Sequence, residues 1–208
     1  ARHLHFFLRS FIVQMANPTA RCETTMGEFV LELYLDRVPL TVSNFIDLAQ
    51  SGFYNGLHFH RVIEGFMAQF GCPHTKNPRH KKAGTGAPKN GTFKNLKTGA
   101  TEKRTNGGKI QDEHTSRDTN ATGTVSMANT GKANTGGSQI FINVTDNSFL
   151  DWFSPGKSKH PVFGKIVSGM DVIETMMKQP VFNDNPYTPI MMKKITISGV
   201  PDILPSKL

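Results

Sequence analysis

The chain has 208 residues, of which 37% are hydrophobic and 19% charged, and it contains 19 glycines and 12 prolines. This length suits one domain with a full hydrophobic core, and the composition excludes a disordered, collagen-like or fibrous protein. With two cysteines, Cys22 and Cys72, and no CxxC motif, the sequence excludes a disulfide framework or a cysteine zinc site and favours a reducing compartment.

The formal net charge of +8 is concentrated in one segment. Residues 74–109 contain ten lysines and arginines but one acidic residue, Glu102. A basic segment can attract nucleic acid, but Phe93 is its sole aromatic residue, so a platform for stacking bases is missing. We therefore disfavour nucleic acid as a partner and interpret the segment as a solvated loop.

Residues 1–14 differ from the rest of the chain, because no acidic residue precedes Glu23 and the apolar runs are broken by Arg9 and Ser10. Runs this short exclude a membrane span, and we expect no membrane partner. An arginine-bearing, acid-free start resembles a mitochondrial presequence, and the alternative is an upstream extension before Met15. We prefer an upstream extension, followed by a single domain over residues 15–208. We expect a cytoplasmic location, with a mitochondrial location as the alternative.

The first predicted elements are a hairpin and a helix. Residues 21–34 alternate between apolar and polar side chains around Met26, which predicts two strands joined by a turn. From Thr41 to Ala49 the apolar residues recur with helical period, with Thr41 as the predicted N-cap and Gly52 just past the end.

The second half of the chain predicts mostly strands. Residues 74–109 show little periodicity and are expected to form long loops. We expect strands at residues 123–128, 139–144, 162–167 and 192–200, and a second helix at residues 169–178. Many short strands with two helices, not in βαβ alternation, favour an antiparallel barrel or sandwich, and the pattern alone does not distinguish these two.

The common catalytic signatures are missing from the sequence. It has no phosphate-binding loop, no paired carboxylates and no histidines in metal-ligand spacing, so we expect neither metal nor cofactor. Residues 59–70, FHRVIEGFMAQF, instead place a permanent cation, Arg61, among apolar side chains. Either this arginine extends to water, or an apolar pocket requires a fixed hydrogen-bond donor.

Three stretches together resemble the cyclophilin family of peptidyl-prolyl isomerases. They are FHRVIEGFMAQF, then VSMANTGKANTGGSQIFI at residues 125–142, then FLD and HPVFGKI around His160. The resemblance runs over residues 21–200 and implies a mainly β fold: a closed eight-stranded antiparallel β-barrel capped by two α-helices. It also implies isomerisation of X-Pro bonds in peptides and proteins, assistance to protein folding, and a monomer.

By this resemblance Arg61 is the catalytic residue, Gln69 orients it, and Asn129 offers backbone contacts to a peptide. The implied substrate-binding residues are His60, Phe66, Met67, Gln69, Ala128, Asn129, Gln139, Phe141, Phe149, Leu150 and His160. A secondary groove is implied at Thr85, Lys109 and Thr130. Each residue alone would suit a barrel core or surface, and a non-catalytic proline-binding module on the same fold is the alternative function.

The sequence departs from the family pattern in three places, of which the first is Phe70-Gly71, where the family often has Gly-Gly after the glutamine. Phe149 stands where many members have tryptophan, which predicts weak binding of the macrocyclic peptide cyclosporin, and several residues containing Trp152 are added after it. Gly108 stands where an acidic residue is common, so we expect an electropositive groove that prefers acidic substrates. Residues 87–106 are an added basic segment that we expect to be mobile, sensitive to trypsin and dispensable.

Overall fold

The computed structural model describes residues 16–201, and the predicted extension at residues 1–14 lies outside this range. Within it no helix is long and apolar enough to span a membrane. The helices are α1 (Pro39–Gln50) and α2 (Met170–Met177), with 3-10 turns η1 (Pro73–Lys76) and η2 (Ser148–Leu150). The strands are β1 (Thr19–Thr24), β2 (Gly27–Leu33), β3 (Arg61–Ile63), β4 (Met67–Phe70), β5 (Gly91–Lys94), β6 (Thr101–Arg104), β7 (Thr124–Met127), β8 (Ile140–Asn143), β9 (Val162–Ser168), β10 (Val181–Phe182), β11 (Asn185–Pro186) and β12 (Met192–Ser198).

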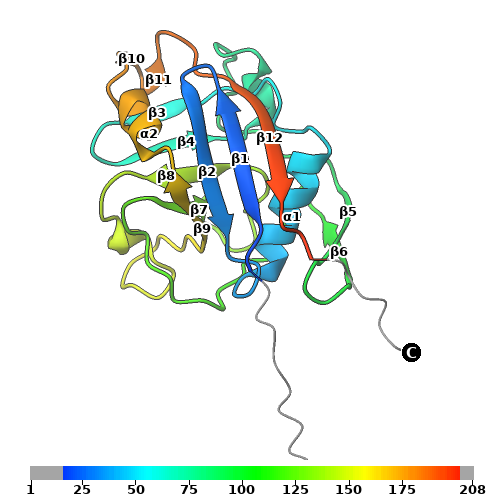
Figure 1. Cartoon of the computed structure of the whole chain (residues 1–208). Coiled ribbons are helices and arrows are strands. Elements are labelled where there is room, and N and C mark those ends of the chain that lie inside the picture. Colours follow the sequence, from blue (N-terminus) through cyan, green and yellow to red (C-terminus); the bar gives the residue numbers. More distant parts are fainter. Residues whose placement is uncertain (1–15, 202–208) are drawn as a thin grey trace, which may run out of the picture.

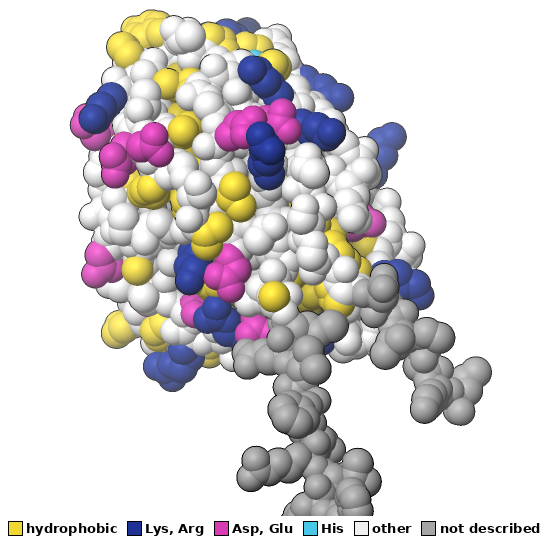
Figure 2. Space-filling model, in the orientation of Figure 1, with side chains coloured by type: hydrophobic (Ala, Val, Ile, Leu, Met, Phe, Trp, Pro, Cys, Tyr) yellow, Lys and Arg dark blue, Asp and Glu magenta, His cyan; other side chains and the backbone are white. Residues whose placement is uncertain are grey.

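Eight strands form one curled antiparallel sheet in the order β12-β1-β2-β9-β7-β8-β4-β3 (Figure 1). The predicted first hairpin is confirmed as β1 and β2, which pair from Thr19↔Glu32 to Thr24↔Gly27. The later strands are also confirmed as β7, β8, β9 and β12. Charged side chains of both signs are interspersed over the face that carries β1, β2 and β12 (Figure 2).

The expectation of a closed barrel is wrong, because the edge strands β3 and β12 do not pair with each other. The chain just before β3 meets the chain at the start of β12 through an isolated bridge, His58↔Met191, and three backbone hydrogen bonds, but no ladder between the two strands. The bonds run from Gly56 N to Met192 O at 2.8 Å, from Met192 N to Leu57 O at 2.8 Å and from Phe59 N to Ile190 O at 2.9 Å. In β3 itself the amide of Val62 donates to the carbonyl of Asp184 at 2.7 Å. The β10–β11 turn therefore occupies the edge of β3, and the sheet remains a half-barrel.

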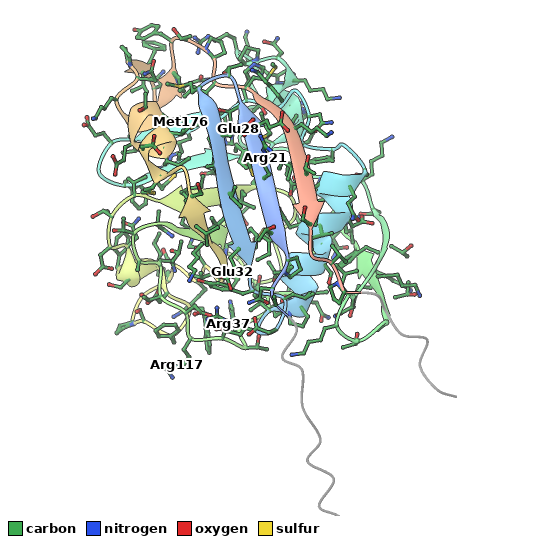
Figure 3. The ribbon with its side chains drawn as sticks, viewed as in Figure 1. Arg21, Glu28, Glu32, Arg37, Arg117 and Met176 are labelled. Carbon is green, nitrogen blue, oxygen red and sulfur yellow. The ribbon has the colours of Figure 1, made fainter. Side chains whose placement is uncertain are left out.

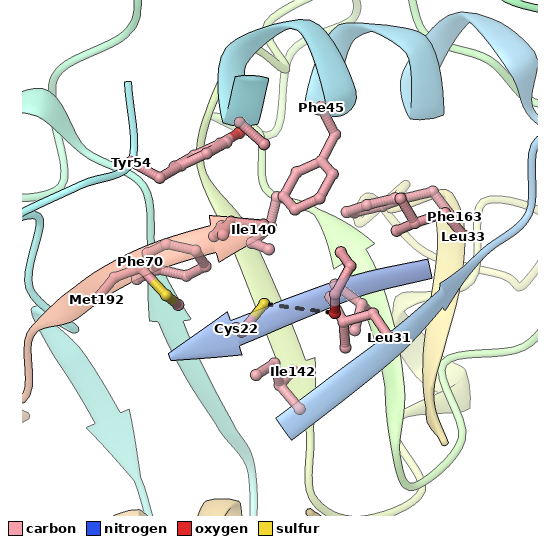
Figure 4. Close-up of a cluster of buried hydrophobic side chains, with 14 of the residues drawn as sticks. Cys22, Leu31, Leu33, Phe45, Tyr54, Phe70, Ile140, Ile142, Phe163 and Met192 are labelled. Atoms are coloured by element: carbon pink, nitrogen blue, oxygen red, sulfur yellow. Dashed lines mark hydrogen bonds between the residues drawn. The ribbon is translucent and has the colours of Figure 1, made fainter. Parts of the chain in front are cut away.

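The core lies between the curled sheet and α1 (Figure 4). The ring of Phe45 on α1 packs 5.5 Å from Phe163 on β9 and 5.3 Å from Tyr54, and Tyr54 lies 5.4 Å from Phe70 on β4. All four are at most 1% exposed, and burial of each such side chain contributes about 2–3 kcal/mol to folding. The helix α2 contacts β2, β3 and β4, so two helices cover the sheet as expected.

The N-terminus of α1 differs from the prediction. The helix begins at Pro39 rather than after Thr41, and no side chain of its own caps it. Instead Glu113 accepts hydrogen bonds from the amides of Leu40 at 3.0 Å and Thr41 at 2.8 Å. A carboxylate from a segment distant in sequence thus satisfies the first free amides, a contact that no local signal in residues 38–41 could indicate.

The predicted loop at residues 74–109 contains a hairpin, so the expectation of loops without strands is wrong there, while the mobility, trypsin sensitivity and dispensability of residues 87–106 stay predictions. Strands β5 and β6 pair from Gly91↔Arg104 to Lys94↔Thr101 and lie beside α1 (Figure 1). Arg104 is 7% exposed, and its Nε donates to Asn44 Oδ1 at 2.7 Å. Its Nη2 binds Asp47 Oδ2 at 2.6 Å, and its Cζ lies 4.7 Å from the centre of the Phe93 ring.

Phe93→Ala should therefore destabilise the whole domain. The ring is 4% exposed and belongs to the main core, and removal of a buried phenylalanine costs about 3 kcal/mol through lost burial and the cavity left behind. The free energy of unfolding in urea measures the effect. The exposed neighbour Thr92→Val is the control and should change this free energy by less than about 0.5 kcal/mol. Equal stability of Phe93→Ala and the parent would show that the hairpin does not support the core.

Candidate active site

Arg61, Gln69 and Phe141 form a row across three neighbouring strands. In the register of the sheet Arg61 on β3 lies opposite Gln69 on β4, which lies opposite Phe141 on β8. Side chains of directly opposed residues share one face of an antiparallel sheet. Their neighbours in the strands, such as Val62 and Ala68, point into the core and are at most 1% exposed. The row therefore faces away from the core.

A second apolar cluster lies beside this row, separate from the main core. Met67, Phe141 and Leu150 are buried in it, and partly buried side chains surround them: Ile63, Phe66 and Ala128. The exposed ring of Phe149 stacks on Phe66 with centroids 6.1 Å apart. The ring of His160 meets Phe141 edge-on at 5.2 Å. The structure thus brings together the residues predicted to bind a proline ring.

The guanidinium of Arg61 lies at the border of this cluster, with Cζ 5.9 Å from the centre of the Phe66 ring. Its side chain is 43% exposed, and among the described residues its one ion pair is from Nε to Asp184 Oδ2 at 3.5 Å. Nε makes this contact, whereas Nη1 and Nη2 have no hydrogen-bond partner within the described residues, so they remain open to a ligand. The site therefore holds a permanent hydrogen-bond donor next to an apolar pocket.

Asp184 is a residue of the site that the sequence analysis missed. It lies in the two-residue turn between β10 and β11, where Asn183 and Asp184 have φ of 49° and 63°. This left-handed conformation is tolerated best by glycine, asparagine and aspartate, so the Asn-Asp pair does indicate a turn. The docking of the turn against β3, through Val62, is a tertiary contact that the local sequence does not encode.

Gln69 binds a different partner from the one expected. Its Nε2 donates to Gln139 Oε1 at 3.0 Å, and Gln139 Nε2 in turn donates to the carbonyls of Gly84 at 2.9 Å and Gly86 at 2.8 Å. Within residues 16–201 no side-chain hydrogen bond joins Gln69 to Arg61, although the two residues are opposite each other in the β3–β4 ladder. The two glutamines connect the row that contains Arg61 to the segment around residue 85.

The secondary groove lies between this segment and β7–β8, with a volume of about 70 Å³. Its lining is uncharged: Gln69, Gly84, Gly86, Ala87, Ala128, Asn129, Thr130, Thr135, Gly137, Ser138 and Gln139. Thr130 belongs to it as predicted, whereas Thr85 and Lys109 do not, and Thr85 Oγ1 donates to Lys82 O at 2.8 Å. No charged side chain therefore lines the groove, and a positive potential there would have to come from residues outside its lining.

Gly108 has a steric reason to lack a side chain. Its φ is +83°, and a Cβ atom at this position would lie 1.8 Å from the carbonyl oxygen of Pro88. The added segment that begins near Pro88 thus passes directly against the backbone of Gly108. An acidic residue at position 108 would be incompatible with this packing.

The two predicted histidines occupy different environments. His160 lies at the proline pocket, with Nδ1 3.0 Å from Met127 O, and burial lowers its pKa. His60 is buried and lies beside Gly84, because a Cβ atom added to Gly84 would be 3.3 Å from His60 Nε2. Burial, and secondarily the charge of Arg61, lower the pKa of His60 from 6.5 to about 4. Burial therefore favours the neutral form of both imidazole rings, and the charge of Arg61 favours it further for His60.

Buried polar side chains hold the walls of the pocket in place. Asn147 Nδ2 donates to Phe66 O at 2.9 Å and to Asn143 Oδ1 at 2.8 Å, which joins the η2 segment to β8 and to the turn before β4. Asp151 is 2% exposed and accepts hydrogen bonds from the backbone and side chain of Asn120 at 2.7 Å and 2.8 Å. These contacts fix Phe66 and Leu150 relative to the sheet.

Trp152 does not lie in the groove. Its Nε1 donates to Ser116 O at 2.7 Å, and its ring stacks on His114 with centroids 5.1 Å apart. The indole donor is therefore occupied on the side remote from Phe66. In the described part of the chain no group of three or more His, Cys, Asp or Glu side chains could hold a metal ion.

Comparisons with known proteins agree with this geometry. The family model described as "Cyclophilin type peptidyl-prolyl cis-trans isomerase/CLD" matches residues 19–197. Peptidyl-prolyl cis-trans isomerase A of Dickeya dadantii is 36% identical, over 85% of this chain and 80% of its own. Human peptidyl-prolyl cis-trans isomerase-like 3 is also 36% identical, over 86% and 94%. A crystal structure of a Cryptosporidium parvum cyclophilin-type isomerase matches with a TM-score of 0.69 and 28% identity, over 88% and 98%.

The depressed pKa of His60 predicts a loss of stability in acid. Because the folded-state pKa of about 4 lies below the ordinary 6.5, the unfolded chain binds this proton first as the pH falls. The free energy of unfolding should therefore decrease between pH 6.5 and about 4, by on the order of 3 kcal/mol from this ring.

Urea unfolding of the parent and of His60→Gln at pH 7, 6, 5 and 4.5 measures this effect. His60→Gln should show a shallower decrease, because its side chain does not titrate. Parallel pH profiles of the two proteins would contradict the assignment.

Proposed function

The chain belongs to the cyclophilin-type peptidyl-prolyl cis-trans isomerase family and is a peptidyl-prolyl isomerase, and we propose that Arg61 and the adjacent apolar cluster form its catalytic centre. The observation that carries this proposal is the placement of the Arg61 guanidinium at the border of a pocket built from Phe66, Met67, Phe141 and Leu150. A cyclophilin-type isomerase of Cryptosporidium parvum, 27% identical with a TM-score of 0.68, was crystallised in the presence of the dipeptide Ala-Pro.

The reaction requires rotation about a bond with partial double-bond character. Its barrier is about 18–20 kcal/mol, so uncatalysed exchange at proline takes tens to hundreds of seconds or so. In the twisted transition state amide resonance is lost, and the prolyl nitrogen acquires a lone pair. A donor placed at this nitrogen binds the transition state better than the planar ground state and lowers the barrier.

In this protein the free Nη atoms of Arg61 would supply that donor. The apolar cluster holds the proline ring, and the surrounding protein lowers the local dielectric, which strengthens the hydrogen bond. Asp184 contacts Nε and so limits rotation of the guanidinium without occupying the Nη atoms. No covalent bond forms or breaks, and no proton is transferred.

The substrate backbone would run along Asn129. Its side chain is engaged elsewhere, since Nδ2 donates to Lys159 O at 2.8 Å and Oδ1 accepts from the amide of Gly131 at 2.9 Å. The backbone amide and carbonyl of Asn129 are therefore the groups offered to a peptide. Residues on the amino side of the proline would extend over Ala128 and Gln139 into the secondary groove.

We propose assistance to folding as the physiological role, because X-Pro exchange is slow enough to limit the folding of other proteins. The cytoplasmic location and the monomeric state predicted from the sequence stay predictions.

Arg61→Ala should lower kcat/KM by about 100-fold or more, the usual cost of removing one preorganised donor. A protease-coupled assay on X-Pro peptides measures this. Arg21→Ala is a matched control, because Arg21 pairs with Glu28 at 2.9 Å on the outer face of β1 and β2 (Figure 3). Near-full activity of Arg61→Ala would refute the catalytic role and favour a proline-binding module without turnover.

Cyclosporin should inhibit the protein weakly. Phe149 keeps an apolar wall but has no donor, and a buried ligand carbonyl without a partner costs about 1–3 kcal/mol. Binding should therefore be roughly ten- to a hundredfold weaker than in the Phe149→Trp variant, at about one decade per 1.4 kcal/mol. Turnover should be similar in both proteins.

Inhibition titrations of the parent, Phe149→Trp and Trp152→Phe test this prediction. Trp152 is fixed at Ser116, so Trp152→Phe should leave the inhibition constant unchanged. Tight inhibition of the parent that survives Trp152→Phe would show that the indole donor is not needed.

A further inference from the structure

A second pocket opens next to the groove, on the side away from the residue 85 segment. It has a volume of about 100 Å³ and is lined by parts of three segments: residues 112–114, 129–133 and 157–159. Asn129 lines both this pocket and the secondary groove. A peptide that binds along the backbone of Asn129 therefore passes the mouth of the second pocket.

The lining of the second pocket carries a net positive charge. Lys132, Lys157 and Lys159 contribute to it, against one carboxylate, that of Asp112. Within residues 16–201 none of the three lysines forms an ion pair with an acidic side chain. Lys159 Nζ donates to Ser154 O at 2.7 Å, which fixes its position and leaves two of its protons for a ligand.

Asp112 is occupied by the protein itself. Its Oδ2 accepts from the amide of Asn134 at 2.8 Å, and its own amide donates to Asn134 Oδ1 at 2.8 Å. This reciprocal pair closes the loop that carries Lys132. The carboxylate thus supports the wall of the pocket, although its charge still offsets part of the positive field.

His114 also belongs to the lining of the second pocket. Its Nε2 is buried and has no hydrogen-bond partner within the described residues. The ring is held parallel to Trp152, at an interplanar angle of 4°, and Trp152 is anchored to Ser116. A buried ring nitrogen without a partner is unfavourable unless a water or another polar group binds it.

The wall that carries Lys157 and Lys159 belongs to the residues added between Asp151 and His160. It is tied to the groove, because Asn129 Nδ2 donates to Lys159 O at 2.8 Å. The added segment therefore supplies two of the three cations and the tryptophan behind His114. The uncharged secondary groove offers no comparable site for an anion.

We propose that this pocket binds an anionic side chain of the peptide substrate, a carboxylate of Asp or Glu or a phosphate of phosphoserine, a few residues from the proline. The inference rests on the proposed function, because the groove delivers the peptide to the pocket. An extended peptide advances about 3.3 Å per residue, so successive side chains occupy successive positions along the groove and the position that reaches the second pocket is found by varying them one at a time. Selectivity for an anionic side chain near the proline is then determined by the second pocket, outside the site that holds the proline ring.

Paired peptides test the proposal, with Glu or Gln at each of the three positions before and after the X-Pro bond. For at least one position the parent protein should prefer Glu over Gln by about three- to tenfold at low salt, because the lysines are partly exposed. The preference should fall toward unity at about 0.5 M salt. If the pocket binds the more highly charged phosphate, the preference for a phosphoserine peptide over its Ser counterpart should exceed the preference for Glu over Gln.

Two measurements separate this inference from the catalytic one. The ratio of kcat/KM for Glu and Gln peptides reports on substrates that turn over. The ratio of Kd values, followed by fluorescence of the sole tryptophan, Trp152, reports on binding without turnover. If neither peptide is isomerised but the Kd ratio favours Glu, the proposed function fails while the anion pocket stands.

Charge-matched variants locate the effect. Lys132→Gln/Lys157→Gln should reduce both ratios to about one, whereas Lys193→Gln/Lys194→Gln, with the same change in net charge on β12, should retain them. An equal reduction in both double variants, or no preference above twofold in the parent at any position, would overturn the proposal.

Discussion

The binding face of this isomerase depends on one buried carboxylate, that of Asp151. A buried charge is costly unless donors surround it, and here the side chains of Thr119 and Asn120 and a backbone amide supply them. These donors define one position for the segment that follows β8. In that position Leu150 enters the apolar cluster and Phe149 covers Phe66, so a polar contact below the surface determines the shape of an apolar pocket above it.

The electrostatics of the site follow from its partial burial. The pKa values of His60 and His160 are lowered by burial, so both rings stay neutral at neutral pH. Arg61 keeps its charge because a guanidinium does not lose its proton, and Asp184 offsets that charge from the Nε side alone. One permanent donor therefore faces the proline pocket, which suits a reaction that needs a hydrogen bond in the transition state and no proton transfer.

The two segments that depart from the family pattern have different consequences. The hairpin β5–β6 packs Phe93 and Arg104 against α1 and belongs to the stable part of the domain. The basic side chains of this hairpin do not line the secondary groove, whose lining is uncharged. The residues between Asp151 and His160 instead bring Lys157 and Lys159 next to Asn129, so the positive charge near the proposed path of the substrate comes from lysines outside the basic segment 74–109.

The sequence by itself determined the first hairpin, the strands β7, β8, β9 and β12 and the two helices, because side-chain alternation and local spacing are properties of the chain. It did not reveal the short strands β3 and β4. The order of its motifs singled out Arg61, Met67 and Phe141 as candidate site residues. Tertiary structure alone decided which distant groups meet these residues. Glu113 at the start of α1 and Asp184 beside Arg61 come from segments with no local relation to their partners. The open edge of the sheet, the buried hairpin and the site of positive charge likewise depend on contacts across the fold, since a long-range contact is a property of two segments and neither one encodes it alone.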